Sequence, residues 1–180
     1  ERTLGEQMKT SEEFDRATLQ AVLDASSDRA NPDAEALYRI VRDTLRIAVV
    51  GISRDPAKAA RRVPSYLAAK GGDIIPVNPS AERILGKPVR RSLTEVDEPV
   101  DMVLVFRPSA EAGEIALQAA ARPERPFIWL QEGIRADGVA EQLRSQGVPV
   151  VQDLCLYKVH KALGDTMRRA EERGLDIPDV

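Results

Sequence analysis

Short apolar runs alternate with longer segments of mixed polarity along the chain from Ile47 onward. The run Ile47-Ala48-Val49-Val50 is apolar at every position, which is typical of a strand covered on both faces, and Gly51 ends it. Similar runs predict further strands over 74–77, 102–106, 127–130 and 148–151. The segments between them predict helices over 56–70, 109–121 and 138–146. Strands separated by helices pair in parallel through right-handed crossovers, so the pattern predicts an α/β fold with a doubly wound parallel sheet in three layers.

The chain before Arg46 has a helical pattern. Ser11 is placed to cap a first helix, with an apolar stripe that would contain Phe14, Leu19, Val22 and Leu23. Asn31 is placed to cap a second helix that has Pro32 at its first position. The stripe of this second helix would contain Leu37, Tyr38, Ile40, Val41 and Leu45. We therefore divide the chain into an N-terminal helical arm over 1–45, a main domain over 46–163 and a C-terminal helical tail over 164–180. The arm either packs on the main domain or binds an unknown protein partner.

Charge and composition exclude several classes of function. The chain has 180 residues, which suits one domain with a short extension, and a formal net charge of -3. It therefore lacks the global positive field that holds nucleic acid or anionic lipid, and we expect neither a nucleic-acid nor a membrane partner. No apolar run approaches the ~20 residues needed to cross a bilayer, and the first residues have no signal-peptide pattern. Cys155 is the single cysteine and cannot form an internal disulfide, so we expect a cytoplasmic protein.

Polar residues and glycines follow the predicted strands, where the ligand crevice of a doubly wound sheet lies. Gly51 and Ser53 suit a phosphate, because glycine lets the backbone approach closely while a hydroxyl and helix amides donate to the oxygens. Arg54, Lys58 and Arg107 would supply positive charge around the crevice without making the whole protein basic. The simpler alternative is a tight turn at Gly51 with Ser53 capping the next helix, and Arg61 and Arg62 as a solvated helix face.

Other functions that proteins of this topology carry out need residues that this sequence does not have at the required places. A dinucleotide fingerprint has three glycines and an acid about twenty residues later, whereas this turn has one glycine and the second strand is followed by Asn78. A phosphate-accepting receiver domain needs acids after the first strand and an aspartate at the end of a later strand, where Phe106-Arg107 stands here. A thiolate and imidazole pair of Cys155 and His160 would need proximity and an oxyanion site, and we interpret Cys155 as a buried structural residue. We expect no metal site and no catalytic group.

Several ordered motifs resemble a known family, the stand-alone bacterial CoA-binding proteins. Their Rossmann-like fold is similar to the CoA-binding domain of the succinyl-CoA synthetase α subunit. The resemblance runs from about Arg46 to about Leu163. The motifs are Val49-Val50-Gly51-Ile52-Ser53-Arg54-Asp55-Pro56, Val63-Pro64-Ser65-Tyr66-Leu67, Ile75-Pro76-Val77-Asn78-Pro79, Leu85-Gly86-Lys87, Val100-Asp101-Met102-Val103-Leu104-Val105-Phe106-Arg107-Pro108, Trp129-Leu130-Gln131-Glu132-Gly133 and Asp153-Leu154-Cys155-Leu156.

The resemblance implies that coenzyme A or an acyl-CoA is the ligand and that the carboxyl ends of the strands bind it. The implied binding residues are Gly51, Ile52, Ser53, Arg54, Lys58, Val77, Asn78, Pro79, Phe106, Arg107, Gln131 and Gly133. Of these, Gly51 and Ser53 would form the phosphate turn, and the segment 77–79 would lie beside the adenosine. The alternative is an NAD(P)-type dinucleotide-binding enzyme or redox regulator, which rests on fold analogy.

This chain departs from the family pattern at three places. Ala59-Ala60 stands where the family often has Pro-Ser, Leu154 stands in place of an arginine, and Val159 stands in place of a glutamate. The ligase relative also depends on a second domain and a second subunit that this length does not hold. We therefore expect a binding protein without ligase activity of its own.

Overall fold

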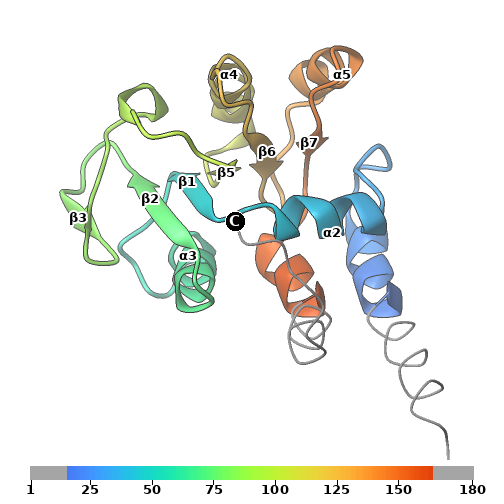
Figure 1. Cartoon of the computed structure of the whole chain (residues 1–180), viewed down its shortest axis with the longest axis horizontal. Helices are drawn as coiled ribbons and strands as arrows, with labels where there is room; N and C mark the ends of the chain where they lie inside the picture. Colours follow the sequence, from blue (N-terminus) through green and yellow to red (C-terminus); the bar gives the residue numbers. More distant parts are fainter. Residues whose placement is uncertain (1–15, 164–180) are drawn as a thin grey trace, which may run out of the picture.

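Five parallel strands form the centre of the molecule in the computed structural model, which describes residues 16–163 (Figure 1). The sheet has the order β2-β1-β5-β6-β7, and its pairings are all parallel. The predicted doubly wound α/β sheet is therefore confirmed. Its strands are β1 (Arg46–Val50), β2 (Asp73–Val77), β5 (Met102–Val105), β6 (Phe127–Leu130) and β7 (Val150–Val151).

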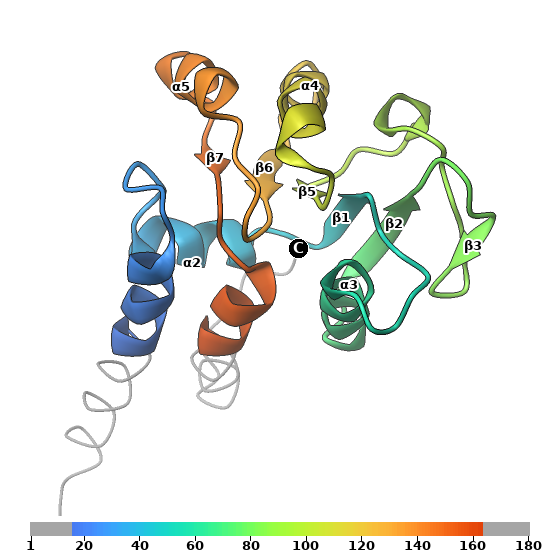
Figure 2. The ribbon, with the colours of Figure 1, turned by 180° about the vertical axis from the view of Figure 1, so that it is seen from behind.

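Helices cover both faces of this sheet and make the three predicted layers (Figures 1 and 2). One face carries α4 (Ser109–Ala120) and α5 (Asp137–Ser145), and the other carries α3 (Ala59–Ala69) with the helical segment 156–163. Each face has its own apolar core. Because both faces are covered, every residue of β5 is buried, which explains its unbroken apolar sequence.

Several predicted boundaries shift by a few residues. The helix predicted from residue 56 begins at Ala59, because 51–58 form an extended turn, and the strand predicted from residue 148 begins at Val150. β5 ends at Val105, so Phe106 belongs to the loop after the strand. Such shifts are expected, because helix and strand ends are the parts that local sequence patterns specify least.

A small hairpin and a short helical turn between β2 and β5 have no counterpart in the predicted elements. They are β3 (Arg83–Ile84), β4 (Lys87–Pro88) and the 3-10 helix η1 (Leu93–Glu95). Leu85 and Gly86 turn the hairpin with φ of 53° and 71°. Strands of two residues are too short to show an alternating pattern, which is why the sequence did not reveal them.

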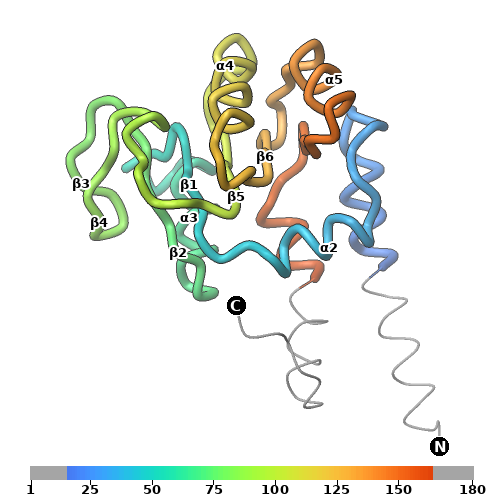
Figure 3. The backbone as a smooth tube through the Cα atoms, turned by 45° about the horizontal axis from the view of Figure 1, so that its top comes forward, coloured from blue at the N-terminus to red at the C-terminus, as the bar shows by residue number. Residues whose placement is uncertain are grey.

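The N-terminal arm lies against the main domain. Its helical segment 16–25 and the helix α2 (Ala34–Arg42) contribute Leu19 and Leu37 to the same core as α3. Figure 3 shows α2 running beneath the sheet toward the start of β1. The described part of the arm therefore packs on the domain, as the first of the two interpretations expected, while Ser11, Phe14 and the tail over 164–180 lie outside the described residues.

The prediction that Asn31 caps the second helix is wrong. Asp33 is the N-cap, and its carboxylate accepts the amide of Ala36 at 2.9 Å. Asn31 instead uses its side-chain amide to accept the amide and donate to the carbonyl of Gln152, each at 2.8 Å. Asn31 thus pairs with the amide and the carbonyl of the residue that directly follows the edge strand β7. Because these groups are paired, they are not free to bind another strand at this edge.

Leu45, predicted in the apolar stripe of the second helix, lies beyond the end of α2 and is 45% exposed. Among the residues that the structure describes, no helix is long and apolar enough to span a membrane.

Candidate functional site

The turn after β1 brings the ends of three strands together. Gly51 has φ of 87°, and its amide donates to the carbonyl of Val77 at the end of β2, at 2.9 Å. A Cβ at Gly51 would lie 2.8 Å from Cδ of Arg107 and 3.2 Å from the carbonyl carbon of Phe106, both of which follow β5. Glycine is therefore required twice at this position, by the left-handed backbone and by the close approach of the neighbouring loop.

Ser53 organises the rest of this turn without capping the helix. Its hydroxyl accepts the amide of Asp55 at 3.0 Å, and its own amide donates to the carbonyl of Ala60 at 3.1 Å. The residue at the N-cap of α3 is Lys58, which makes no side-chain capping bond. The amides of Ala59 and Ala60 find no acceptor among residues 16–163, so the positive end of the α3 dipole is open to an anion.

Basic side chains surround this helix start. Arg54 and Lys58 are exposed. Arg62, expected on a solvated face, folds back and donates to the carbonyl of Ala57. Arg61 is half-buried, and its Nε finds no hydrogen-bond partner within the described part of the chain. An unpaired buried donor of this kind beside open amides favours an anionic ligand at the start of α3.

Asn78, at the end of β2, is occupied by structural hydrogen bonds. Its Nδ2 donates to the carbonyl of Ile52 at 2.8 Å, and its Oδ1 accepts the amides of Ser80 at 2.9 Å and Ala81 at 3.0 Å. One side chain thus ties the turn after β1 to the turn after β2. It therefore fixes the relative position of these two turns.

Three more of the predicted site residues lie at or just after the ends of β1 and β2, and they differ in exposure. Ile52 and Val77 are 0% and 2% exposed as whole residues, and their carbonyls accept hydrogen bonds from Asn78 and Gly51. Both residues therefore lie beneath the surface and support the turn. Pro79 is exposed.

Arg107 extends across the turn and is held by a carboxylate. Its Nε and Nη2 donate to the two oxygens of Glu111, in the first turn of α4, at 2.6 and 3.0 Å. These hydrogen bonds hold the pKa of Arg107 above and the pKa of Glu111 below their ordinary values. The guanidinium is therefore preoriented over Gly51, but an incoming anion must share it with Glu111.

The residues after β6 lie at the same end of the sheet. Gln131 is 4% exposed and its Oε1 accepts the amide of Leu156 at 3.2 Å. Gly133 has φ of 83°, and its amide donates to Oδ1 of Asp153 at 2.6 Å. The predicted residues Gln131 and Gly133 thus lie at the strand ends with Gly51 and Arg107, in a loop braced from the next strand.

Asp153 is a structural residue of this region to which the sequence had assigned no role. Its Oδ2 accepts the amide and the hydroxyl of Ser27, at 2.8 and 2.6 Å, which fastens the N-terminal arm to the loops after β6 and β7. Burial by itself raises the pKa of Asp153, but the bonds from Ser27 and Gly133 outweigh it and hold the pKa below its ordinary value. Ser27 lies 126 positions away, and no local pattern reveals such a partner.

Cys155 and His160 do not form a pair. Cys155 is 7% exposed. Nδ1 of His160 lies 3.0 Å from the hydroxyl of Tyr66 on α3, and the two rings meet edge to face. Across residues 16–163 no cluster of three or more histidine, cysteine or acidic residues is arranged to hold a metal ion.

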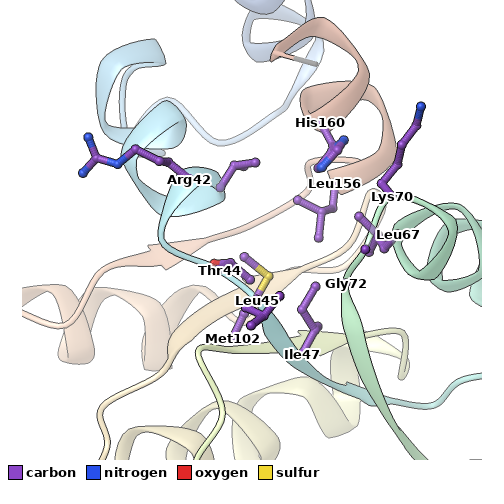
Figure 4. Close-up of a pocket in the computed structure, with 12 residues that line it drawn as sticks. Arg42, Thr44, Leu45, Ile47, Leu67, Lys70, Gly72, Met102, Leu156 and His160 are labelled. Atoms are coloured by element: carbon purple, nitrogen blue, oxygen red, sulfur yellow. The ribbon is translucent and has the colours of Figure 1, made fainter. Parts of the chain in front are cut away.

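A separate cavity lies at the opposite end of the sheet, near the first residues of β1 and β5 (Figure 4). Ile47 and Met102 form part of its lining. It is therefore distinct from the predicted ligand site at the carboxyl ends of the strands.

Comparisons with known proteins point to one family. The model of the CoA binding domain matches residues 45–161. The protein YneT of Bacillus subtilis (strain 168) is 34% identical over 130 residues, which cover 72% of this chain and 96% of YneT. A solved Thermus thermophilus structure is 36% identical, covers 73% of this chain and 99% of its own, and superposes with a TM-score of 0.67. The ADP-forming acetate–CoA ligase II of Archaeoglobus fulgidus is 28% identical over 94 residues, which make up 14% of the ligase.

Proposed function

This chain belongs to the CoA binding domain family, and we propose on that premise that it binds coenzyme A or an acyl-CoA at the carboxyl ends of its strands, without catalysing a reaction. The ligand would lie across the turn after β1, with its diphosphate toward the start of α3. We place this activity in a reducing cytoplasm, where Cys155 remains a thiol.

The observation that carries the proposal is the convergence of anion-binding groups on one turn. Gly51 permits a close backbone approach, the amides of Ala59 and Ala60 are open, and Arg107 crosses the turn from β5. Backbone amides and a guanidinium at a helix start form a site for phosphate groups, of which CoA has a diphosphate and a ribose phosphate.

The geometry beside β2 favours CoA over NAD. Dinucleotide sites of the NAD type place an acid after the second strand to grip the ribose hydroxyls. Here that position is Asn78, whose side-chain amide is used to join two turns. CoA has no special requirement for that acid.

The proposal assigns no chemistry to Cys155 or His160. The thiol is buried, and the imidazole faces Tyr66 on α3. The ligase similarity covers 14% of that enzyme, so a nucleotide-driven ligase reaction is not proposed for this chain.

Calorimetric titration of the full chain with CoA, acetyl-CoA, NAD and ATP tests the proposal. We expect a CoA species to bind most tightly, and Arg107→Ala to weaken that binding roughly tenfold because a charge-assisted hydrogen bond to phosphate is lost. Ser53→Ala should weaken it less, since a neutral hydroxyl contributes about half as much.

Arg39→Ala is the matched control. Arg39 also pairs with a glutamate one helical turn away, at 2.6 Å, but on α2. CoA affinity of this variant should stay at the wild-type value. Tighter binding of NAD than of every CoA species, or equal losses in the two arginine variants, would refute the proposed function or its site.

A further inference from the structure

The cavity at the amino ends of the strands exists because α2 lies across this end of the sheet. Val41, Arg42 and Thr44 form one side of it, and they precede the residues that match the family model. Leu67 at the end of α3, together with Lys70, Gly71 and Gly72 in the turn after it, forms another side. The cavity is therefore built partly from the arm that this chain adds to the common domain.

The floor of the cavity is apolar. Ile47, Leu67, Met102 and Leu156 line it, and Leu45 adds a side chain that is 45% exposed (Figure 4). Its volume is about 140 Å³. An apolar cavity of about 150 Å³ is known to hold a benzene molecule, so this floor fits an apolar body of that size.

The rim of the cavity is basic. Figure 4 shows the nitrogen atoms of Arg42, Lys70 and His160 on the side away from Met102. Arg42 pairs with Asp43 at 3.0 Å, whereas Lys70 lies 5.7 Å from the ring centre of Tyr66 and has no acidic partner within the described ranges. Of the described residues that line the cavity, none is acidic.

We propose that this cavity is a second ligand site, which takes a small monocarboxylate with an apolar body of about benzene size. The apolar body would rest against Leu45, which is the exposed apolar residue of the lining, and the carboxylate would lie at the rim beside Lys70 and His160. A charge-assisted hydrogen bond from Lys70 supplies the preference for an acid over a neutral molecule. The site is independent of the proposed CoA crevice, because the two lie at opposite ends of the sheet.

The pKa of His160 is sensitive to the charge at this rim. Burial, followed by the charge of Lys70, holds the pKa of His160 below its ordinary value. The charged or titratable groups around the imidazole are Tyr66 on α3, Lys70 directly after α3, Arg42 across the cavity, and Tyr157 and Lys161 on its own helix. A carboxylate bound beside Lys70 would offset that positive charge and raise the pKa of His160.

The test is a proton NMR titration of the full chain with benzoate, with benzyl alcohol as the uncharged ligand of the same shape. His160 is the single histidine, so its imidazole signal is unambiguous. We expect benzoate to shift this signal saturably and to raise the His160 pKa, while benzyl alcohol binds at least several-fold more weakly. Lys70→Met should weaken benzoate binding roughly three- to tenfold.

Lys161→Met is the matched control, because Lys161 also lies 5.7 Å from the centre of a tyrosine ring but does not line the cavity. Its benzoate affinity should remain within about twofold of the wild type. The proposal is overturned if benzoate gives no saturable shift, if benzyl alcohol binds equally well, or if the two lysine variants lose the same affinity. Displacement of benzoate by CoA would assign it to the other end of the sheet and would also overturn the proposal.

Discussion

Replacing Gly51 by alanine perturbs the point where three strand ends meet. The backbone there has φ of 87°, which costs a residue with a Cβ about 1–2 kcal/mol. The new Cβ would also lie 3.2 Å from the carbonyl carbon of Phe106, which cannot move freely, and 2.8 Å from Cδ of Arg107, which can. Overpacking of this kind costs roughly 1–3 kcal/mol.

The two costs together predict that Gly51→Ala lowers the free energy of unfolding by about 3 kcal/mol, or Tm by roughly 6–12 °C for a chain of this length. The variant Gly86→Ala separates the backbone cost from the overpacking cost. Gly86 has φ of 71°, but a Cβ there would meet nothing within 4 Å. This variant should therefore lose only the backbone part, about 1–2 kcal/mol.

Urea unfolding followed by circular dichroism measures both variants, and CoA titration measures the site. Gly51→Ala should also weaken CoA binding, since Arg107 must move away from the turn. Adding Arg107→Ala to Gly51→Ala should restore part of the stability, because it removes the Arg107 Cδ that the new Cβ would contact. It should not restore CoA binding. If Gly51→Ala costs no more stability than Gly86→Ala, the close approach of the two strand ends is not an energetic constraint and this reasoning is refuted.

Three further predictions concern the walls of the crevice. Asn78→Ala should lower the free energy of unfolding by about 1–3 kcal/mol in urea titrations, because the carbonyl of Ile52 and the amide of Ala81 each lose the partner of a partly buried hydrogen bond; an unchanged midpoint would contradict this. Glu111→Gln should tighten CoA binding roughly two- to fivefold by releasing Arg107 to the phosphates, and weaker binding in calorimetry would show that Glu111 instead positions the arginine. Asp153 has a lowered pKa in the folded state, so its charged form stabilises the fold above the unfolded value of about 3.9, and this contribution is lost as the pH falls through the folded value. The stability difference between the wild type and Asp153→Asn should therefore shrink between about pH 5 and pH 2 in urea titrations, and a constant difference would exclude this linkage.

The apolar runs of the sequence determined the sheet. A strand buried on both faces must be apolar at every position, and residues 47–50 of β1 and all of β5 meet this condition in their sequence alone. Glycine and polar residues directly after these strands also pointed to the edge where the candidate crevice lies. The parallel pairing followed from the helices between the strands.

Only the tertiary structure decided which side chains act together at that edge. Arg107 lies over Gly51 because β5 pairs directly with β1. The periodicity of apolar residues predicts the strands but does not predict their order in the sheet. Ser27 reaches Asp153 across 126 positions, and the amino-end cavity arises where α2 crosses the sheet. Local sequence patterns specify which faces are buried, whereas partnerships between distant residues depend on the packing of the whole chain.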